Sequence, residues 1–268
     1  MAAIGRLPHW ATGVIGGVVI IALWWISAVT VFQNVGAAPG GAIPTPAAVV
    51  SQLITDGFAF YWPHILATTT EAGIGFLWGN AFALLLAALV LIFPRIEKTA
   101  MQVAVITYCI PIVAIGPIAY IVIGPSSGGG ISGTAVFLAA LSVFFTTVVG
   151  SLVGLKAADA ASLDIITVYG GNRLTQLRKV RLIAGLPSVL NALQVAAPAA
   201  FLGAVLGEYM GGAERGLGVA LLAAGSSANV DRVWGLAIIS GLVAGLGYLM
   251  FGLIARVVAP WSDGRSAR

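Results

Sequence analysis

Residues 132–155 read SGTAVFLAALSVFFTTVVGSLVGL, an apolar run without a charged side chain. A helix needs roughly 20 consecutive apolar residues to cross a hydrocarbon core about 30 Å thick, and this run is long enough. Because a chain in lipid must satisfy its backbone hydrogen bonds internally, such a run is expected to be helical. The stretch therefore predicts an integral membrane protein.

Further apolar runs lie on both sides of this one. The predicted spans cover residues 12–33, 64–93, 99–123, 132–155, 183–209 and 232–258. The whole chain of 268 residues is 59% hydrophobic and 8% charged, with a mean hydropathy of +1.03, whereas soluble globular chains carry about 25% charged residues. We expect one all-α integral membrane domain over residues 1–268, with six transmembrane helices.

The basic residues collect on one side of these spans. If the N-terminus is cytoplasmic, only Arg215 and Arg232 of the thirteen lysines and arginines fall outside. Cytoplasmic loops retain Lys and Arg, so we expect a multi-pass protein of the bacterial inner membrane. Both termini are then inside, and Gly128 to Gly130 are outside. The net charge is +4, but the basic residues are few and scattered among apolar segments. This pattern favours lipid over nucleic acid as the partner.

Residue types that perform chemistry are sparse. The sequence has no P-loop, no G-x-S-x-G and no paired-carboxylate motif. Its single cysteine, Cys109, lies in an apolar run and has no partner for an internal disulfide. His64 has no second His, Cys or acid at metal spacing. We therefore expect no catalytic residue, no metal and no cofactor in this chain.

Two outside connections have some structure of their own. Ile43-Pro44-Thr45-Pro46 predicts a short helix over residues 47–55 that is capped by Thr45 and begins with a proline. The apolar segment 216–224 is too short to span a bilayer. It is expected either to rest against the membrane or to dip into the bundle.

The long connection over residues 156–182 is the most informative polar segment. Apolar residues three apart predict a helix over residues 159–169, and Gly170-Gly171-Asn172 predicts its C-terminal cap. A second, basic helix is expected from Arg173 towards Leu182. We call residues 156–182 the elbow, and its length predicts that another protein docks there.

The elbow resembles the coupling loop of permeases of binding-protein-dependent ATP-binding-cassette (ABC) importers, in particular those of the taurine, sulfonate and nitrate branch. The family's acid, two alanines and glycine match Asp164, Ile165, Ile166 and Gly170. This sequence departs from the pattern with Asp for Glu, isoleucines for the alanines, and Ile183 where proline is usual. Other features match in order: Gly75-Phe76, Pro111 and Pro117, Gly124, Leu186-Pro187, Glu208, Gly216-Leu217-Gly218 and Pro260-Trp261.

This resemblance implies a permease of the type I importer fold, with the elbow between helices 4 and 5. It implies a cytoplasmic ABC ATPase dimer that holds ATP and Mg²⁺, a second permease subunit and an extracytoplasmic solute-binding protein. A homodimer of permeases is the default, and a heterodimer is the alternative because the elbow departs from the usual pattern. The residues expected to contact the ATPase are Asp159, Asp164, Ile165, Ile166, Gly170, Gly171 and Arg173.

Four residues are candidates for the translocation pathway. Pro111 and Pro117 are either tolerated kinks or bends that line the pathway. Glu71 and Glu208 are ionisable groups in apolar spans, which marks them as functional candidates. Both acids lie near the outer ends of their predicted spans, so an ordinary interfacial location is the alternative.

The cargo stays open between taurine, other sulfonates, nitrate and small aromatic or vitamin-like molecules. The main alternative function is an ion-coupled secondary transporter, which requires charged or unwound sites near the midplane and often internal repeats. A membrane scaffold or an enzyme subunit is a third reading. Copurification of an ATPase would distinguish the importer from both.

Overall fold

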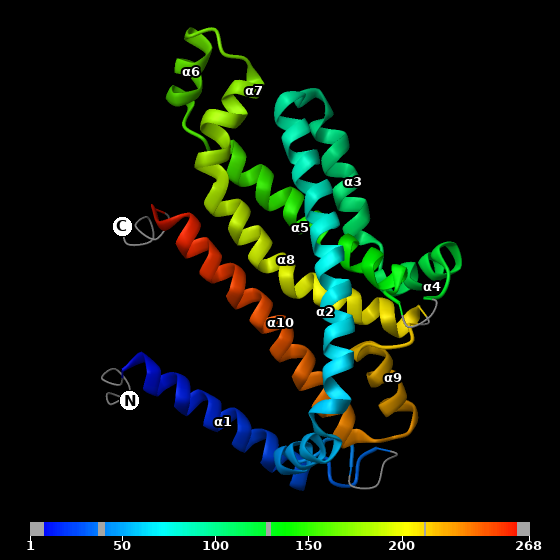
Figure 1. The fold of residues 1–268 in the computed structure, drawn as a ribbon. Helices are drawn as coiled ribbons and strands as arrows, with labels where there is room; N and C mark the ends of the chain where they lie inside the picture. The colour runs from blue at the N-terminus through cyan, green and yellow to red at the C-terminus, as the bar shows by residue number, and fades with distance from the viewer. Residues whose placement is uncertain (1–7, 37–40, 127–129, 212, 262–268) are drawn as a thin grey trace. The chain divides into compact units, whose positions relative to one another are not determined.

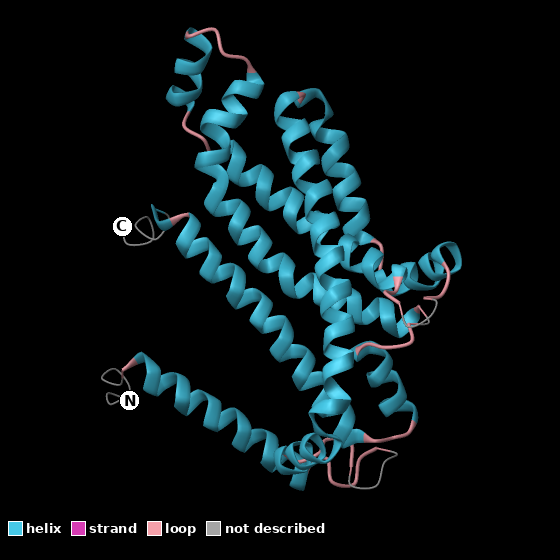
Figure 2. Ribbon diagram, viewed as in Figure 1, coloured by secondary structure: helices cyan, strands magenta, loops and turns pink. Residues whose placement is uncertain are grey.

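The computed structural model describes residues 8–36, 41–126, 130–211 and 213–261, and all regular structure in these ranges is helical (Figure 1, Figure 2). The α-helices are α1 (His9–Thr30), α2 (Pro46–Ile92), α3 (Glu97–Cys109), α4 (Ile112–Ile123), α5 (Gly133–Lys156), α6 (Ala160–Val168), α7 (Arg173–Gln176), α8 (Leu182–Met210), α9 (Leu217–Ser226) and α10 (Val230–Val258). The predicted all-α class is confirmed. The two chain ends and residues 128–129, used above to predict topology, lie outside the described ranges.

Within the described ranges, five helical segments are long and apolar enough to cross a membrane. They are Trp10–Thr30, Pro46–Ile92, Gly133–Lys156, Arg173–Met210 and Val230–Val258. The third predicted span, residues 99–123, is not one continuous helix as expected. It is divided into α3 and α4, which are bent by 94° at a short break.

Proline chemistry explains this break. Ile110 has an extended backbone, with φ −73° and ψ 124°, because a residue before proline is disfavoured in the helical region. Pro111 has no N–H to donate to the helix before it, and it instead precedes the first residue of α4. Pro117 lies inside α4, where the helix continues through it.

The short helix predicted over residues 47–55 is present as the first part of α2. Thr45 Oγ1 accepts a hydrogen bond from Ala48 N at 3.2 Å, as expected of the cap. At Gly57 the backbone leaves helical geometry, with φ +71° and ψ 165°. Glycine adopts this conformation without a Cβ clash, so the short helix and the following span meet at a kink.

The chain forms two compact units, described separately. The smaller one comprises the described parts of Met1–Trp62 and Ala220–Ile239, and the larger one those of Pro63–Val219 and Ser240–Arg268. In the smaller unit, Trp24 stacks on Trp234 with ring centroids 5.5 Å apart. The Trp24 indole N–H donates to the Pro44 carbonyl at 2.9 Å.

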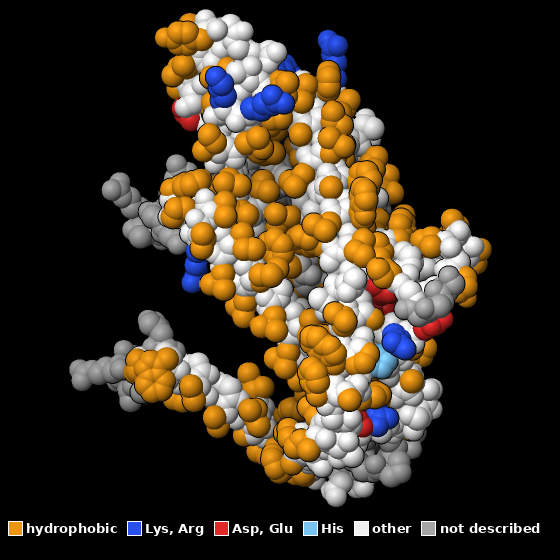
Figure 3. Space-filling view, viewed as in Figure 1, with side chains coloured by type: hydrophobic (Ala, Val, Ile, Leu, Met, Phe, Trp, Pro, Cys, Tyr) orange, Lys and Arg blue, Asp and Glu red, His pale blue; other side chains and the backbone are white. Residues whose placement is uncertain are grey.

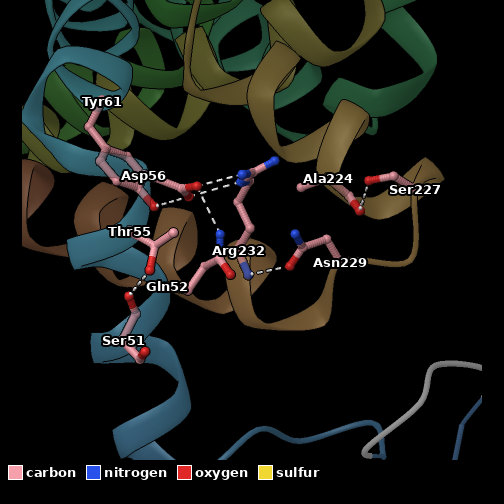
Figure 4. A network of polar contacts seen from close by, with 9 residues as sticks. All are labelled: Ser51, Gln52, Thr55, Asp56, Tyr61, Ala224, Ser227, Asn229 and Arg232. Carbon is pink, nitrogen blue, oxygen red and sulfur yellow. Dashed lines mark hydrogen bonds and ion pairs between the residues drawn. The ribbon is translucent and has the colours of Figure 1, made fainter.

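An ion pair joins two helices within the smaller unit (Figure 4). The Arg232 guanidinium donates to both Asp56 carboxylate oxygens, and its Nε lies 2.9 Å from Oδ2. Gln52 Nε2 and the Tyr61 hydroxyl each donate to Asp56 at 2.8 Å. The Asp56 side chain is only 4% exposed, so these donors compensate for its burial. Sequence reasoning counted Arg232 as an outside residue and missed this partner.

The larger unit is built around α5 and α8, its most extensive helix contact, which lie side by side in Figure 1. A Cβ at Gly203 would reach 2.7 Å from the Leu138 carbonyl, and one at Gly207 would overlap the Ala135 backbone. Small residues at these positions let the two backbones approach. Helix α2 joins the pair through a buried hydrogen bond of 2.6 Å from Thr147 Oγ1 to Asn80 Oδ1.

Hydrophobic side chains cover the visible face of these helices, and several Lys and Arg side chains gather at the end that holds α6 and α7 (Figure 3). This distribution is that of a protein whose helix surfaces face lipid and whose polar connections lie outside it. The larger unit therefore has a basic end, where the elbow lies. The other ends of α5 and α8 hold Ser132 and Glu208.

Candidate functional site

Helix α6 of the elbow begins with a side-chain cap. Asp159 Oδ2 accepts hydrogen bonds from Ser162 N at 3.0 Å and from Ser162 Oγ at 3.1 Å. A carboxylate at this position satisfies backbone donors that have no partner within the helix. The predicted coupling residue Asp159 thus fixes where α6 starts.

A left-handed turn ends α6 where the sequence predicted a cap. Gly170 has φ +77°, and its N–H donates to the Thr167 carbonyl at 3.0 Å. Gly171 N donates to the Ile166 carbonyl at 2.8 Å, and a Cβ at Gly171 would overlap the Ile166 side chain. Gly170 is therefore needed for its backbone conformation, whereas Gly171 is needed to leave space for the Ile166 side chain.

The segment after this turn differs from the prediction of a second short helix. Asn172 caps α7 by accepting from Thr175 N at 3.0 Å, and Arg173 is its first residue. The chain continues through a π-helical turn at Leu177–Arg181 directly into α8. A helix does begin at Arg173, as predicted, but it runs on into the membrane span because no residue between Arg173 and Leu182 breaks the helical path. The elbow is one free helix, α6, attached to the extended start of α8.

One contact holds the elbow together and two fasten it to the rest of the larger unit. Gln176 Nε2 donates to Thr167 Oγ1 at 2.9 Å, which ties α7 to α6. Arg181 Nη1 donates to the Leu155 carbonyl at 3.1 Å, at the end of α5. Lys156 forms an ion pair with Glu97 at the start of α3. The elbow is therefore held in one geometry by both neighbouring helices.

The outward side of α6 carries apolar side chains that nothing covers within the described larger unit. Val168 is 84% exposed, Tyr169 87% and Ile165 56%. Asp164 is exposed on the same helix, whereas Ile166 is partly buried beneath Gly171. The predicted coupling residues thus lie together, with Ile165 outward and Ile166 inward.

An open cavity of about 790 Å³ lies between the elbow and the connection from α2 to α3. Its lining is mixed, with apolar side chains beside several charged ones. The lining residues are Val90, Leu91, Pro94, Glu97, Lys156, Thr167, Gly171, Asn172, Arg173, Gln176 and Arg181. Arg173, predicted as a coupling residue, thus faces a space that a docking partner can enter.

At the other ends of α5 and α8, Glu71 and Glu208 lie together. Both are 2% exposed, and their carboxyl groups interact directly with each other. Glu71 Oε1 accepts from Ser132 N, and Glu208 Oε2 accepts from Gly218 N, each at 2.6 Å. Both carboxyls are therefore buried inside the larger unit, and each is held there by a backbone donor.

Three successive backbone N–H groups, in the Gly-Leu-Gly turn at the start of α9, donate hydrogen bonds to side chains. Gly216 N donates to His64 Nδ1 at 3.1 Å, Leu217 N to Thr68 Oγ1 at 2.8 Å, and Gly218 N to Glu208. Sequence reasoning missed His64 and Thr68. Their spacing with Glu71, four and then three residues, places all three on one helix face and was the available signal.

The two proline candidates belong to α4 and to the break before it, not to the elbow. Pro111 is at the break between α3 and α4. A Cβ at Gly116, next to Pro117, would lie 3.0 Å from Met210 Cβ, so α4 packs on the last turn of α8. In the described ranges, no group of three His, Cys, Asp or Glu side chains is arranged to hold a metal ion.

Comparison with known proteins identifies the family of this chain. Residues 79–265 match the family described as binding-protein-dependent transport system inner membrane component. A Haemophilus influenzae relative described as an ABC transporter permease protein is 30% identical over 216 residues, which cover 81% of this chain and 83% of the relative. SsuC of Bacillus subtilis, a permease protein named for aliphatic sulfonate transport, is 26% identical over 257 residues, which cover 95% and 88%.

The fold also has a counterpart among solved structures. A chain of the inward-facing MetNI methionine ABC transporter superposes with a TM-score of 0.63 and 17% identity, over 76% of this chain and 99% of that one. The likeness confirms the predicted type I importer permease fold, and SsuC agrees with the predicted sulfonate branch. The chain therefore belongs to the binding-protein-dependent transport system inner membrane component family and is a membrane-spanning permease subunit of an ABC importer.

Proposed function

We propose that α6 and the turn at Gly170 form the surface through which a cytoplasmic ABC ATPase drives this permease. The observation that supports this most is the exposure of Val168 and Tyr169 at the end of a short helix, which Gln176 holds through Thr167. Large apolar side chains exposed on a polar connection mark a protein contact. ATP and Mg²⁺ belong to the ATPase in this proposal, and this chain supplies no catalytic group.

The charges around α6 fit such a contact. Arg173 faces the cavity beside the elbow, and Lys156 and Arg181 line the same space. Lys156 is paired with Glu97, and Arg181 donates to the Leu155 carbonyl. The Arg173 side chain has no hydrogen bond or ion pair to another described residue, so it is the one of these three cations left for a partner. An acidic or carbonyl-rich edge of the ATPase would complement it. Asp164, exposed on α6, would meet a donor.

We propose further that the protein lies in the bacterial inner membrane with both termini and the elbow in the cytoplasm. The basic end of the larger unit (Figure 3) supports this orientation. The turn at Gly216–Gly218 and the acid pair would then lie towards the outside, where a solute-binding protein delivers the cargo. The name of SsuC makes a small sulfonate one candidate cargo among those the sequence left open.

Two permease chains would enclose one pathway and meet one ATPase dimer. A homodimer is the default because closed two-fold assemblies are the commonest kind. The exposed position of Ile165 supports it, since the larger side chain at this family position points out of the elbow and leaves its internal packing unchanged. A heterodimer would instead supply the usual elbow from a second, different permease.

The first prediction tests the elbow with two variants of one residue. At Gly170 a Cβ would meet nothing within 4 Å, so only the φ of +77° resists substitution. We expect Gly170→Val, whose β-branched side chain disfavours this φ, to strain the turn by about 1–2 kcal/mol. Transport should fall at least tenfold with normal membrane insertion. Gly170→Asn, which tolerates the left-handed region, should keep most transport.

Transport by Gly170→Val at the wild-type rate would contradict the proposed role of the elbow. The measurement is uptake in cells, with the amount of inserted permease determined in the same membranes. Gly170→Asn is the matched control because it adds a side chain of similar volume at the same position.

The second prediction concerns orientation. Two reporters are fused after Arg268, one that works only in the cytoplasm and one that works only outside the membrane. The cytoplasmic reporter should give a signal at this position, and the external reporter should give none. The opposite pattern should hold for insertions at Ser126, in the loop after α4. An active external reporter at Arg268 would overturn the proposed topology.

The third prediction concerns the assembly. Intact mass measurement of the complex purified through a tag on this chain should give two copies of this permease and two ATPase chains. One copy of this permease beside a different, related membrane chain would show a heterodimer and contradict the homodimer. Complexes that never contain an ATPase would contradict the proposal that an ABC ATPase drives this permease.

A further inference from the structure

Glu71 and Glu208 form an acid pair in which one oxygen of each buried carboxyl has no hydrogen-bond donor. A role as two separate pathway residues does not explain this feature. Glu71 Oε2 and Glu208 Oε1 are buried and have no hydrogen-bond donor, although both side chains are 2% exposed. The other oxygen of each carboxyl is occupied by a backbone N–H. Two donor-less oxygens therefore remain in a place where the two carboxyl groups interact.

Among the residues that the structure describes, no Lys or Arg contacts the pair to neutralise two charges. The polar groups around the pair are neutral. The backbone N–H groups of Ser132 and Gly218 donate to it, and the Thr68 hydroxyl lies beside Glu208. His64, one helical turn from Thr68, accepts a hydrogen bond through Nδ1, which leaves that nitrogen without a proton. Arg215 acts electrostatically on His64 and is itself exposed.

Two adjacent carboxylates in a water-poor site cannot both be ionised without a large cost. A proton between the two donor-less oxygens removes one charge and supplies the missing donor in a single step. It leaves one negative charge, which the two backbone N–H groups stabilise. We propose that Glu71 and Glu208 form a binding site for one shared proton, and that the protonated pair latches the start of α5 and the Gly216–Gly218 turn to α2.

The latch follows from what each carboxyl holds. Glu71, on α2, holds the first turn of α5 through Ser132 N, and Glu208, on α8, holds the turn before α9 through Gly218 N. A Cβ at Gly216, where φ is +148°, would overlap the Glu208 carboxyl. The turn is therefore built against this carboxyl, and repulsion within an unprotonated pair would push apart the segments that the pair joins.

Glutamine variants imitate the protonated pair. In Glu71→Gln, Oε1 can still accept from Ser132 N while the amide N–H donates to Glu208 Oε1, and Glu208→Gln is the mirror case. Each variant holds one negative charge when its remaining carboxyl is ionised, and it needs no shared proton. Glu71→Ala instead leaves the Glu208 carboxylate buried without its partner.

The test is infrared spectroscopy of the purified complex, which detects the C=O stretch of a protonated carboxyl. The wild type should show one such band at neutral pH. Glu71→Gln and Glu208→Gln should each abolish it, and Glu214→Gln, which removes an exposed acid from the same loop, should leave it. Absence of the band in the wild type, or its survival in both single variants, would overturn the shared proton.

Thermal unfolding as a function of pH tests the latch. The wild type should lose stability on the alkaline side when the shared proton leaves, whereas both glutamine variants should lack that loss. Amide exchange at Gly218 and Ser132 should quicken in the wild type over the same pH range. Identical pH profiles for wild type and Glu71→Gln would contradict the latch.

The shared proton and the latch do not depend on the proposed function. The infrared and exchange measurements need no transport and no ATP hydrolysis. A failure of the elbow prediction would therefore leave the proton site standing, and an absent band would leave the elbow unaffected.

Discussion

Helices α5 and α8 approach each other closely because Gly203 and Gly207 present no side chain to the backbone of α5. In lipid, helices gain no hydrophobic driving force by associating, so close van der Waals packing must hold them together. The contact matters beyond stability. The elbow connects one end of α5 to one end of α8, and the acid pair joins the opposite ends through Ser132 and Glu208.

This arrangement gives each polar feature a mechanical role. Arg181 and Lys156 fasten the elbow to the end of α5 and to α3, so a force on α6 reaches both packed helices. At the far end, Glu208 links α8 to the turn before α9. We expect α5 and α8 to carry motion from the elbow to that turn as one body, since packed interfaces shift between discrete arrangements and do not deform continuously.

Sequence reasoning succeeded where one residue type determines local structure. Apolar runs located the membrane helices, Asp159 and Gly170 marked the two ends of α6, and Thr45 marked the start of α2. These features depend on neighbours in the chain. The bend at Pro111 was within reach as well, because the effect of proline on the preceding residue is local, but a tolerated kink was an equally good reading.

What the sequence could not provide were the long-range pairs. Nothing near Glu71 in the chain indicates Glu208, and Asp56 and Arg232 are joined only after folding. The burial of Glu71 and Glu208 was not predictable from the sequence, because distance from the end of a span does not show which side of a helix faces protein. Helix-face spacing of His64, Thr68 and Glu71 was the one pattern that could have indicated a polar cluster on α2.

The central claim, that α5 and α8 move together between the elbow and the acid pair, is tested most directly by one spin-label distance. Labels replace Val153 on α5 and Leu202 on α8, which are 65% and 60% exposed, in a Cys109→Ser background with the ATPase bound. The account predicts the same distance distribution without nucleotide and with ATP bound. A shift of about 5 Å, one helical turn, would show that the two helices slide past each other and would contradict it.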